Sequence, residues 1–155
     1  MIIVRFAQQD DIPSIAKFNS AMALETEDVF LDNSIVRSGV EAVLNNAELG
    51  FYLIAECDGK QIGQLLITKE WSDWRNKYFW WIQSVYVQPE FRKQNVYRKL
   101  YQKVIEISKN AGNVCGIRLY VDRQNTTAQK VYAKLSMQKS NYLLFEVELT
   151  NVKTV

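Results

Sequence analysis

The chain has 155 residues, of which 48% are hydrophobic, so its length and composition fit one domain over residues 1–155. It contains no histidine, which excludes Ser-His-Asp and Cys-His catalysis and most zinc sites, and no bound metal is expected. The net charge of +2 is small for a nucleic-acid-binding protein, which is more often basic overall.

The first predicted elements are a strand and two helices. Residues 1–7, MIIVRFA, read as a strand rich in β-branched residues. The helix predicted within 8–27 has Asp10 or Asp11 as its cap, and that within 32–50 has Asp32 or Asn33. The start lacks the layout of a signal peptide, and no apolar run reaches the roughly 18 residues of a membrane span. We therefore expect a cytoplasmic protein without a membrane partner.

The middle of the chain predicts a hairpin and an inner strand. Two apolar runs in 51–71 flank Asp58-Gly59, a pair typical of a two-residue hairpin turn. After a polar loop at 72–78, the segment FWWIQSVYV at 79–87 is too apolar to have a solvent face. It is therefore predicted to be a central strand.

The last part of the chain alternates helices and strands. A basic loop leads into a helix at 95–109, and a strand follows at 114–121. A short helix begins after Asn125, and NYLLFEVEL at 141–149 is predicted to be the final strand. The strand–helix–strand order from 79 to 121 implies one parallel pair in an otherwise antiparallel sheet.

The loop before the helix at 95–109 has the features of an anion-binding site. Residues 90–109 hold six basic and two acidic residues, whereas residues 1–89 hold seven basic and twelve acidic ones. A helix N-terminus exposes unpaired backbone N–H groups and carries partial positive charge, to which Arg92 and Lys93 add full charges. Glycine usually gives such loops their positive φ angles, and Asn95 can adopt the same conformation.

Two motifs resemble the GNAT superfamily of acetyl-CoA-dependent N-acetyltransferases. In SVYVQPEFRKQNVY, Arg92 matches the first position of the family's Arg/Gln-x-x-Gly-x-Gly/Ala loop, while Asn95 and Tyr97 replace its small residues. In RQNTTAQKVYAKLSM, Asn125, Ala128 and Tyr132 match the later Asn-x-x-Ala-x-x-x-Tyr motif, and Ser136-Met137 stands where Gly-Phe is usual. The resemblance covers nearly the whole chain.

The resemblance implies an α/β GNAT fold with a mixed, mostly antiparallel sheet of about six or seven strands and about four helices. It implies acetyl-CoA as cofactor, with loop amides 92–97 on its pyrophosphate, the main chain of the central strand on its pantetheine arm, and Asn125 on that arm. The cofactor-binding residues expected are Val85, Tyr86, Val87, Arg92, Lys93, Gln94, Asn95, Val96, Tyr97, Asn125 and Gln129. Tyr132 is the expected general acid toward the leaving thiolate, since a phenol can protonate a thiolate.

The acceptor side is less specific. Glu25 and Glu27, in ALETEDVF, are expected to border the acceptor pocket, and Trp71 and Trp74 to line it by cation–π contact with an amine. The base that removes the amine proton is left open among Glu25, Glu27, Glu70 and Asp73, with Glu70 taken as catalytic. The alternative interpretation is that Glu25 and Glu27 are exposed acids at a helix end and that Trp71 and Trp74 pack over the sheet edge.

Two function classes remain. The first is an N-acetyltransferase acting on a primary amine of a small molecule or peptide by direct transfer in a ternary complex. The second is a non-catalytic acyl-CoA-binding or interaction module in which the loop has diverged. The second motif favours the enzyme, and the acidic first half of the chain favours a cationic acceptor. The sequence decides neither the acceptor nor whether the chain forms a homodimer.

Overall fold

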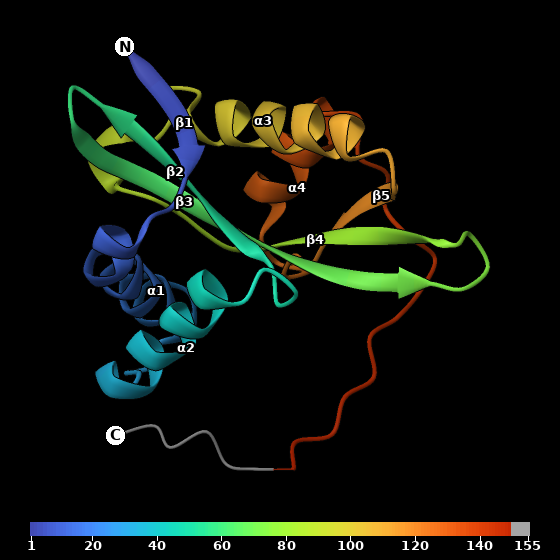
Figure 1. The fold of residues 1–155 in the computed structure, drawn as a ribbon, viewed down its shortest axis with the longest axis horizontal. Coiled ribbons are helices and arrows are strands. Elements are labelled where there is room, and N and C mark those ends of the chain that lie inside the picture. The colour runs from blue at the N-terminus through green and yellow to red at the C-terminus, as the bar shows by residue number, and fades with distance from the viewer. Residues whose placement is uncertain (150–155) are drawn as a thin grey trace. The chain divides into compact units, whose positions relative to one another are not determined.

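A five-stranded sheet organises residues 1–119 in the computed structural model, which describes residues 1–149 (Figure 1). The strands are β1 (Ile2–Phe6), β2 (Phe51–Cys57), β3 (Lys60–Ser72), β4 (Lys77–Val87) and β5 (Val114–Leu119). They lie side by side in chain order. The pairs from β1 to β4 are antiparallel, and β4 with β5 is parallel. The predicted parallel pair is confirmed, and β4 is an inner strand, as its apolar sequence indicated.

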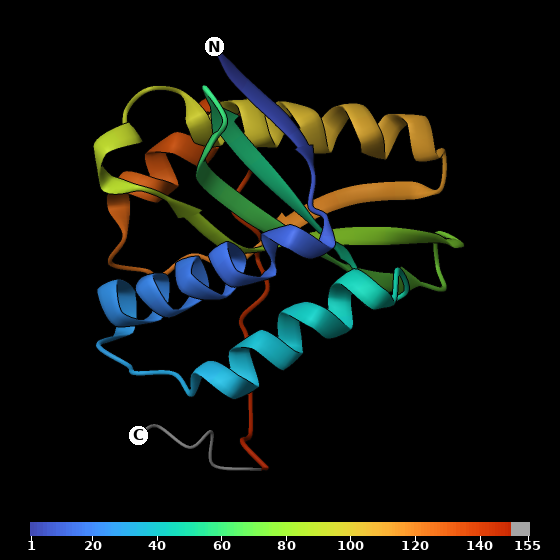
Figure 2. The ribbon, with the colours of Figure 1, turned by 60° about the vertical axis from the view of Figure 1, so that its left-hand side comes forward.

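Three helices cover the two faces of this sheet (Figure 2). They are α1 (Ile12–Glu27) and α2 (Asn33–Asn45) on one face and α3 (Val96–Ala111) on the other. The α3 face buries a core that includes Leu53, Leu65, Val96, Leu100 and Val104. The smaller core on the α1 and α2 face includes Ile12, Ile15, Val40, Tyr52 and Ile54. The loop that precedes α3 is therefore anchored by Val96, the first helical residue, which is buried.

Several local predictions are confirmed. Asp58 and Gly59 both have positive φ angles and connect β2 to β3 through a two-residue turn. Asp32 caps α2 by accepting from the Ser34 and Ile35 amides at 2.8 and 3.2 Å. These signals are local because each depends on the conformation of two to four successive residues.

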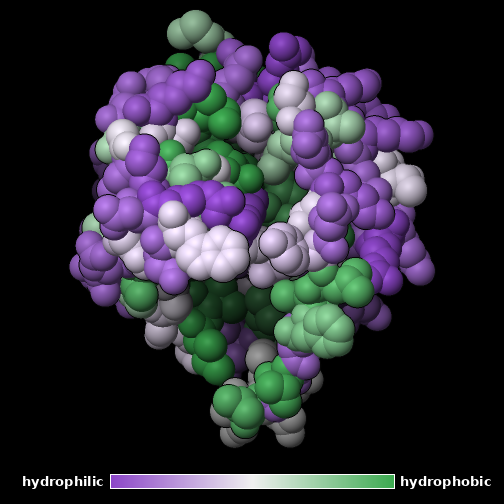
Figure 3. All heavy atoms as spheres, turned by 90° about the vertical axis from the view of Figure 1, so that its right-hand side faces the viewer, coloured by the Kyte–Doolittle hydropathy of each residue, from purple (hydrophilic) through white to green (hydrophobic). Residues whose placement is uncertain are grey.

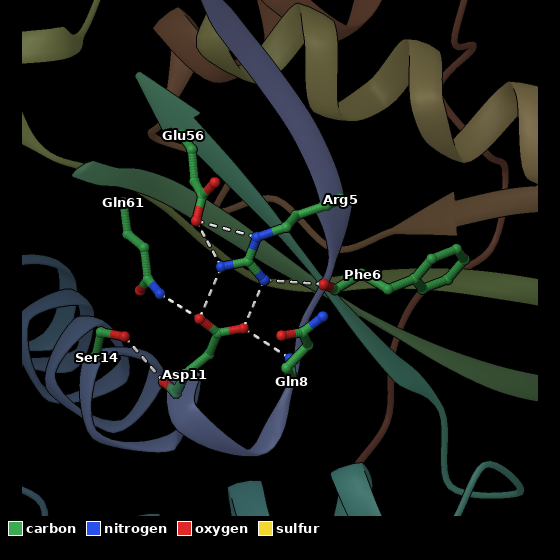
Figure 4. A network of polar contacts seen from close by, with 7 residues as sticks. All are labelled: Arg5, Phe6, Gln8, Asp11, Ser14, Glu56 and Gln61. Carbon is green, nitrogen blue, oxygen red and sulfur yellow. Dashed lines mark hydrogen bonds and ion pairs between the residues drawn. The ribbon is translucent and has the colours of Figure 1, made fainter. Parts of the chain in front are cut away.

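A partly buried ion-pair network attaches the start of α1 to the sheet (Figure 4). The Arg5 guanidinium on β1 donates to both carboxylate oxygens of Asp11, at 2.7 and 2.9 Å, and to Glu56 on β2. Asp11 also accepts from the Gln8 amide and from Gln61 on β3. The Asp11 carboxylate therefore joins the 3₁₀ turn at Gln9–Asp11 directly to β1 and β3, and through Arg5 to β2.

The second compact unit begins at Tyr120. This unit contains helix α4 (Thr126–Lys134). The part of the chain that the structure describes therefore has the predicted four α-helices, and it also has two short 3₁₀ turns. Asn125 caps α4, accepting from the Ala128 amide at 3.0 Å, as the sequence indicated. Ser136, where the family usually has glycine, has a φ of 65° just past the helix end.

The prediction of six to seven strands is wrong for the described residues, because 141–149 form no strand. The segment has the apolar composition of a strand, but a strand also needs a neighbour to pair its backbone and cover its side chains. Its apolar side chains are exposed, Phe145 and Leu149 each by 89%. Figure 3 shows one face of the molecule, on which hydrophobic atoms lie at the surface among hydrophilic ones.

Candidate active site

The second half of β4 is irregular and has one free edge among the strands of residues 1–119. β5 pairs with β4 only over Tyr78–Ile82. Further along, the β3 register shifts from Leu66 opposite Gln83 to Gln64 opposite Tyr86, so β4 carries an extra residue. Ser84 has a φ of 49° at this β-bulge. Bulges re-aim the backbone and are common beside active sites, and here the bulge precedes the main-chain groups of Val85 and Val87.

The loop from β4 to α3 has the left-handed backbone that an anion cradle requires. Lys93 and Asn95 both have φ angles of 63°, which confirms the expectation for Asn95. The Lys99 amide donates to the Asn95 carbonyl at 3.0 Å as α3 begins. The amides before it in the first turn have no acceptor within the helix, so they present donors and partial positive charge.

Gly63 on β3 allows the start of α3 to approach the sheet closely. A Cβ atom at this position would lie 2.9 Å from the Tyr86 carbonyl oxygen and 3.2 Å from Val96 Cγ1. Because Tyr86 precedes the loop and Val96 follows it, Gly63 helps to fix both ends of the anion-binding segment. This role of Gly63 was not predicted from the sequence.

Arg92 is paired within the protein. Its guanidinium donates from Nη1 and Nη2 to the two carboxylate oxygens of Glu25, at 2.6 and 2.7 Å, and from Nε to the Val87 carbonyl at 2.9 Å. The Arg92 hydrogen bonds lower the pKa of Glu25. A residue predicted for the acceptor side and one predicted for the cofactor loop therefore contact each other directly.

The second motif lies in the other unit, on α4. The side-chain amide of Gln129 donates from Nε2 to the backbone carbonyls of Asp122 and Arg123, at 3.1 and 3.0 Å, and so closes the turn before the helix. Burial raises the pKa of Tyr132, which keeps its hydroxyl protonated at neutral pH. The capped turn therefore presents Tyr132 one helical turn beyond Ala128.

Comparison with known proteins identifies the family. The sequence model of the acetyltransferase (GNAT) family matches residues 18–137, across both units. The chain belongs to the acetyltransferase (GNAT) family. This confirms the predicted enzyme class, and acetyl-CoA is the cofactor of the family. No curated protein matches the chain.

Solved structures of this fold include several acetyltransferases. One, described as a possible acetyltransferase from Clostridium difficile 630, shares 38% sequence identity, a TM-score of 0.90, and coverage of 97% of this chain and 99% of its own. A predicted acetyltransferase from Clostridium acetobutylicum, solved with acetyl-CoA, is 20% identical, with a TM-score of 0.78 and coverage of 96% and 97%. The aminoglycoside N-acetyltransferase AAC(6')-Iy, solved with a bisubstrate analogue, is 17% identical, with a TM-score of 0.77 and coverage of 97% and 99%.

Three residues expected at the GNAT acceptor site lie far from the loop. Gln64 pairs with Tyr86, just before the loop, and Glu70 lies six residues further along β3, about 20 Å away at the usual rise per residue. The Glu70 carboxylate accepts from Trp81 Nε1 and from Arg118 Nη1. Trp71 packs edge-on against Tyr78, and Trp74 is 88% exposed at the turn between β3 and β4. Within residues 1–119, Glu25 contacts the loop, whereas Glu70, Trp71 and Trp74 lie away from it.

A buried polar cluster beneath the bulge was missed. Gln64, fully buried on β3, donates to Asn19 Oδ1 at 2.7 Å and to the Ser84 carbonyl at 3.5 Å. Asn19 on α1 in turn donates to the Tyr52 hydroxyl at 3.3 Å, and burial raises the pKa of that hydroxyl. The signal in the sequence was a glutamine within the apolar run IGQLLI. These side chains tie α1 to the strand that carries the bulge.

The described residues set two further bounds. No helix among them is both long and apolar enough to cross a bilayer. Nor do they bring three or more His, Cys, Asp or Glu side chains together in a group that could hold a metal ion.

Asn95→Gly should leave the free energy of unfolding within about 0.5 kcal/mol of wild type and preserve or improve acetyl-CoA affinity. Glycine relieves the left-handed conformation and clears the phosphate path, while its unfolded-state freedom costs roughly 0.4–1 kcal/mol. Asn95→Ala is the control: its Cβ at positive φ should cost about 1 kcal/mol. Urea unfolding and calorimetry measure both effects. Loss of binding in Asn95→Gly alone would make the asparagine amide itself a ligand.

Proposed function

We propose that the protein transfers an acetyl group from acetyl-CoA to a primary amine of a small molecule or peptide, by direct transfer in a ternary complex. The observation that carries this proposal is the bulged strand β4, whose second half pairs with β3 but not with β5, leading into the left-handed loop and α3 in a member of the acetyltransferase family. The solved relatives with acetyl-CoA or a bisubstrate analogue support the fold-level part of this argument.

The residues present fit the cofactor. The amides of residues 92–97 would hold the pyrophosphate, and the main chain of Val85 and Val87 would pair with the pantetheine arm. The positive φ angles of Lys93 and Asn95 provide the backbone turn that glycine usually provides in such loops. Because Arg92 is already neutralised by Glu25, Lys93 is the side chain in the loop proposed to meet a phosphate.

The tyrosine of α4 is proposed as the acid. Bound acetyl-CoA supplies the acetyl group as a thioester, so the reaction releases a thiolate that needs a proton or a hydrogen bond. Tyr132 has a raised pKa and holds its proton at neutral pH. Asn125 and Gln129 support this residue by fixing the turn that opens its helix.

The acceptor is proposed to be cationic before it reacts. Residues 1–89 carry twelve acidic and seven basic residues, which favours an ammonium group over an anion near them. The amine must then lose a proton, and Glu27, Glu70 and Asp73 remain the proposed bases. Glu25 is the weakest of the four candidates, because its ion pair with Arg92 lowers its pKa.

Acetyl-CoA binding should weaken as salt rises, since charge pairing with the phosphates is screened. Lys93→Ala should weaken binding at low salt by about twofold to fivefold, because one exposed charge pair contributes about 0.4–1 kcal/mol. Lys109→Ala removes the same charge from the last turn of α3 and serves as the control. Titration calorimetry at two salt concentrations measures all three proteins. Equal losses of acetyl-CoA affinity in both variants would show that Lys93 of the loop does not contact a phosphate.

A panel of amines tests the reaction itself. Polyamines, aminoglycosides and peptides with a free N-terminus or lysine would be incubated with acetyl-CoA, and release of free thiol would be followed. Acetylation of at least one cationic amine well above the hydrolysis rate is the expected result. Tight acetyl-CoA binding without transfer to any amine would instead support a non-catalytic acyl-CoA-binding module.

A further inference from the structure

The Arg92 side chain connects three separate parts of the first unit. It leaves the loop, its Nε donates to the Val87 carbonyl at the end of β4, and its two terminal nitrogens donate to Glu25 in the last turn of α1. Glu25 is 67 residues away in sequence. Figure 2 shows α1 running across the sheet face, and the Arg92 contacts place its C-terminal end beside the exit of β4.

The planar guanidinium makes this connection specific. A bidentate pair fixes both distance and angle, and the third donor fixes the group against a strand end. Arg92 also lies over the Tyr86 ring, with the guanidinium carbon 5.8 Å from the ring centroid, and that ring contacts Phe18 of α1 at 5.1 Å. The Glu25 carboxylate and the Phe18 ring are therefore two contacts by which α1 holds the segment 86–92.

The pair is too exposed for its main effect to be on global stability. The Arg92 and Glu25 side chains are 40% and 45% exposed, and pairs with such exposure contribute little to the free energy of unfolding. Its consequence is local, because Arg92 directly precedes Lys93 and Asn95, the two residues with left-handed backbone. Holding Arg92 fixes where the loop begins and hence where its amides point.

We infer that Glu25 is a positioning residue for the cofactor loop, acting through Arg92 to hold the amides of residues 92–97 in their anion-binding arrangement. This inference rests on the proposed function of the loop. It reassigns Glu25 from the acceptor pocket, where the sequence placed it, to support of the cofactor site. It also makes Arg92 a structural partner of the loop rather than a direct phosphate ligand.

The change in acetyl-CoA affinity expected for Glu25→Gln is opposite in direction to the one that charge alone would cause. Removing a negative charge near a phosphate site should strengthen binding of an anion if charge alone matters. Glu25→Gln should instead weaken acetyl-CoA binding by about threefold to tenfold, because the neutral amide loses the bidentate ion pair. Glu27→Gln removes the same charge two residues further along α1, and it should leave affinity unchanged or slightly improved.

Arg92→Lys completes the test, because lysine keeps the charge but cannot reach Val87 and both Glu25 oxygens at once. It should weaken binding as Glu25→Gln does, and the double variant should bind no worse than the weaker single variant, as expected for two halves of one interaction. Calorimetry gives the dissociation constants. Tighter binding in Glu25→Gln, or wild-type affinity in Arg92→Lys, would overturn the inference.

A second measurement on the cofactor-free protein separates this inference from the proposed function. NMR order parameters of the backbone amides of residues 92–97 should fall in Glu25→Gln and Arg92→Lys but not in Glu27→Gln, if the pair holds the loop. A wild-type protein that binds no acetyl-CoA would overturn the proposed function, and the order parameters would still decide the role of Glu25. Unchanged order parameters in all three variants would refute the positioning role.

Discussion

Asp11→Ala should lower the free energy of unfolding by about 3 kcal/mol, the lower end of the cost of breaking a buried ion pair. The Asp11 side chain is only 5% exposed, and it accepts from Arg5, the Gln8 amide and Gln61 (Figure 4). Its removal leaves these donors without that acceptor in a partly buried site, where an unsatisfied group is costly. Glu56 still pairs with Arg5, which keeps the expected loss from being larger. Urea unfolding measures the change.

Asp10→Ala is the matched control for this prediction. It removes the same charge from the neighbouring position, where the side chain is exposed, and it should change stability by about 0.5 kcal/mol or less. Equal effects of the two substitutions would show that the network does not stabilise the start of α1.

The Asp11 network should also make stability depend on pH at the acidic end. Its hydrogen bonds with Arg5 hold the pKa of Asp11 below the ordinary value. The unfolded chain therefore binds a proton at this residue at a higher pH than the folded chain does. The stability that Asp11 contributes is present above its ordinary, unfolded pKa of about 4 and is lost as pH falls toward the folded value. The difference between wild type and Asp11→Ala should therefore shrink in acid.

Sequence reasoning succeeded where a feature depends on a few successive residues. The turn at Asp58-Gly59, the caps of α2 and α4, and the left-handed conformation of Asn95 are all of this kind. Each follows from the backbone preferences or short side chain of the residue itself. The positive φ of Lys93 was not predictable in this way, because lysine has no preference for that region and the loop imposes it.

Contacts between residues distant in sequence were beyond the same reasoning. The pairing of Arg92 with Glu25 and of Arg5 with Glu56 spans 67 and 51 residues. In each case the charges were visible in the sequence but their partners were not, because surface acids and bases occur throughout the chain. The sequence could not predict that Glu25 pairs with Arg92, since only tertiary structure decides which of several carboxylates meets an arginine.

The segment 141–149 shows that composition does not determine strand formation. NYLLFEVEL has the β-branched and aromatic residues of a strand, yet the described chain leaves it unpaired. A strand is stabilised by its neighbours on either side, so the sequence of one segment predicts its propensity and not its pairing. The Ser84 bulge has the same origin, because it arises from the register between β3 and β4.

Tyr132→Phe should lower kcat by about 100-fold while changing acetyl-CoA affinity by less than about twofold. The ring remains, so packing of α4 is nearly unchanged, and only the hydroxyl proposed to meet the leaving thiolate is lost. General acid steps contribute about 10²–10⁴-fold, and the low end applies because a thiolate is a tolerable leaving group near neutral pH. An interaction made mainly in the transition state lowers kcat and kcat/KM equally. Steady-state kinetics with the best amine from the panel measures both.

Tyr142→Phe is the control for the hydroxyl, since Tyr142 lies in the same unit with 85% of its surface exposed. It should leave kcat unchanged. Because burial raises the pKa of Tyr132, the wild-type hydroxyl stays protonated through neutral pH, and the gap between wild type and Tyr132→Phe should persist from about pH 7 to pH 9. A Tyr132→Phe enzyme with wild-type kcat across that range would make Tyr132 a packing residue. Water would then supply the proton, and the second motif would serve only to build α4.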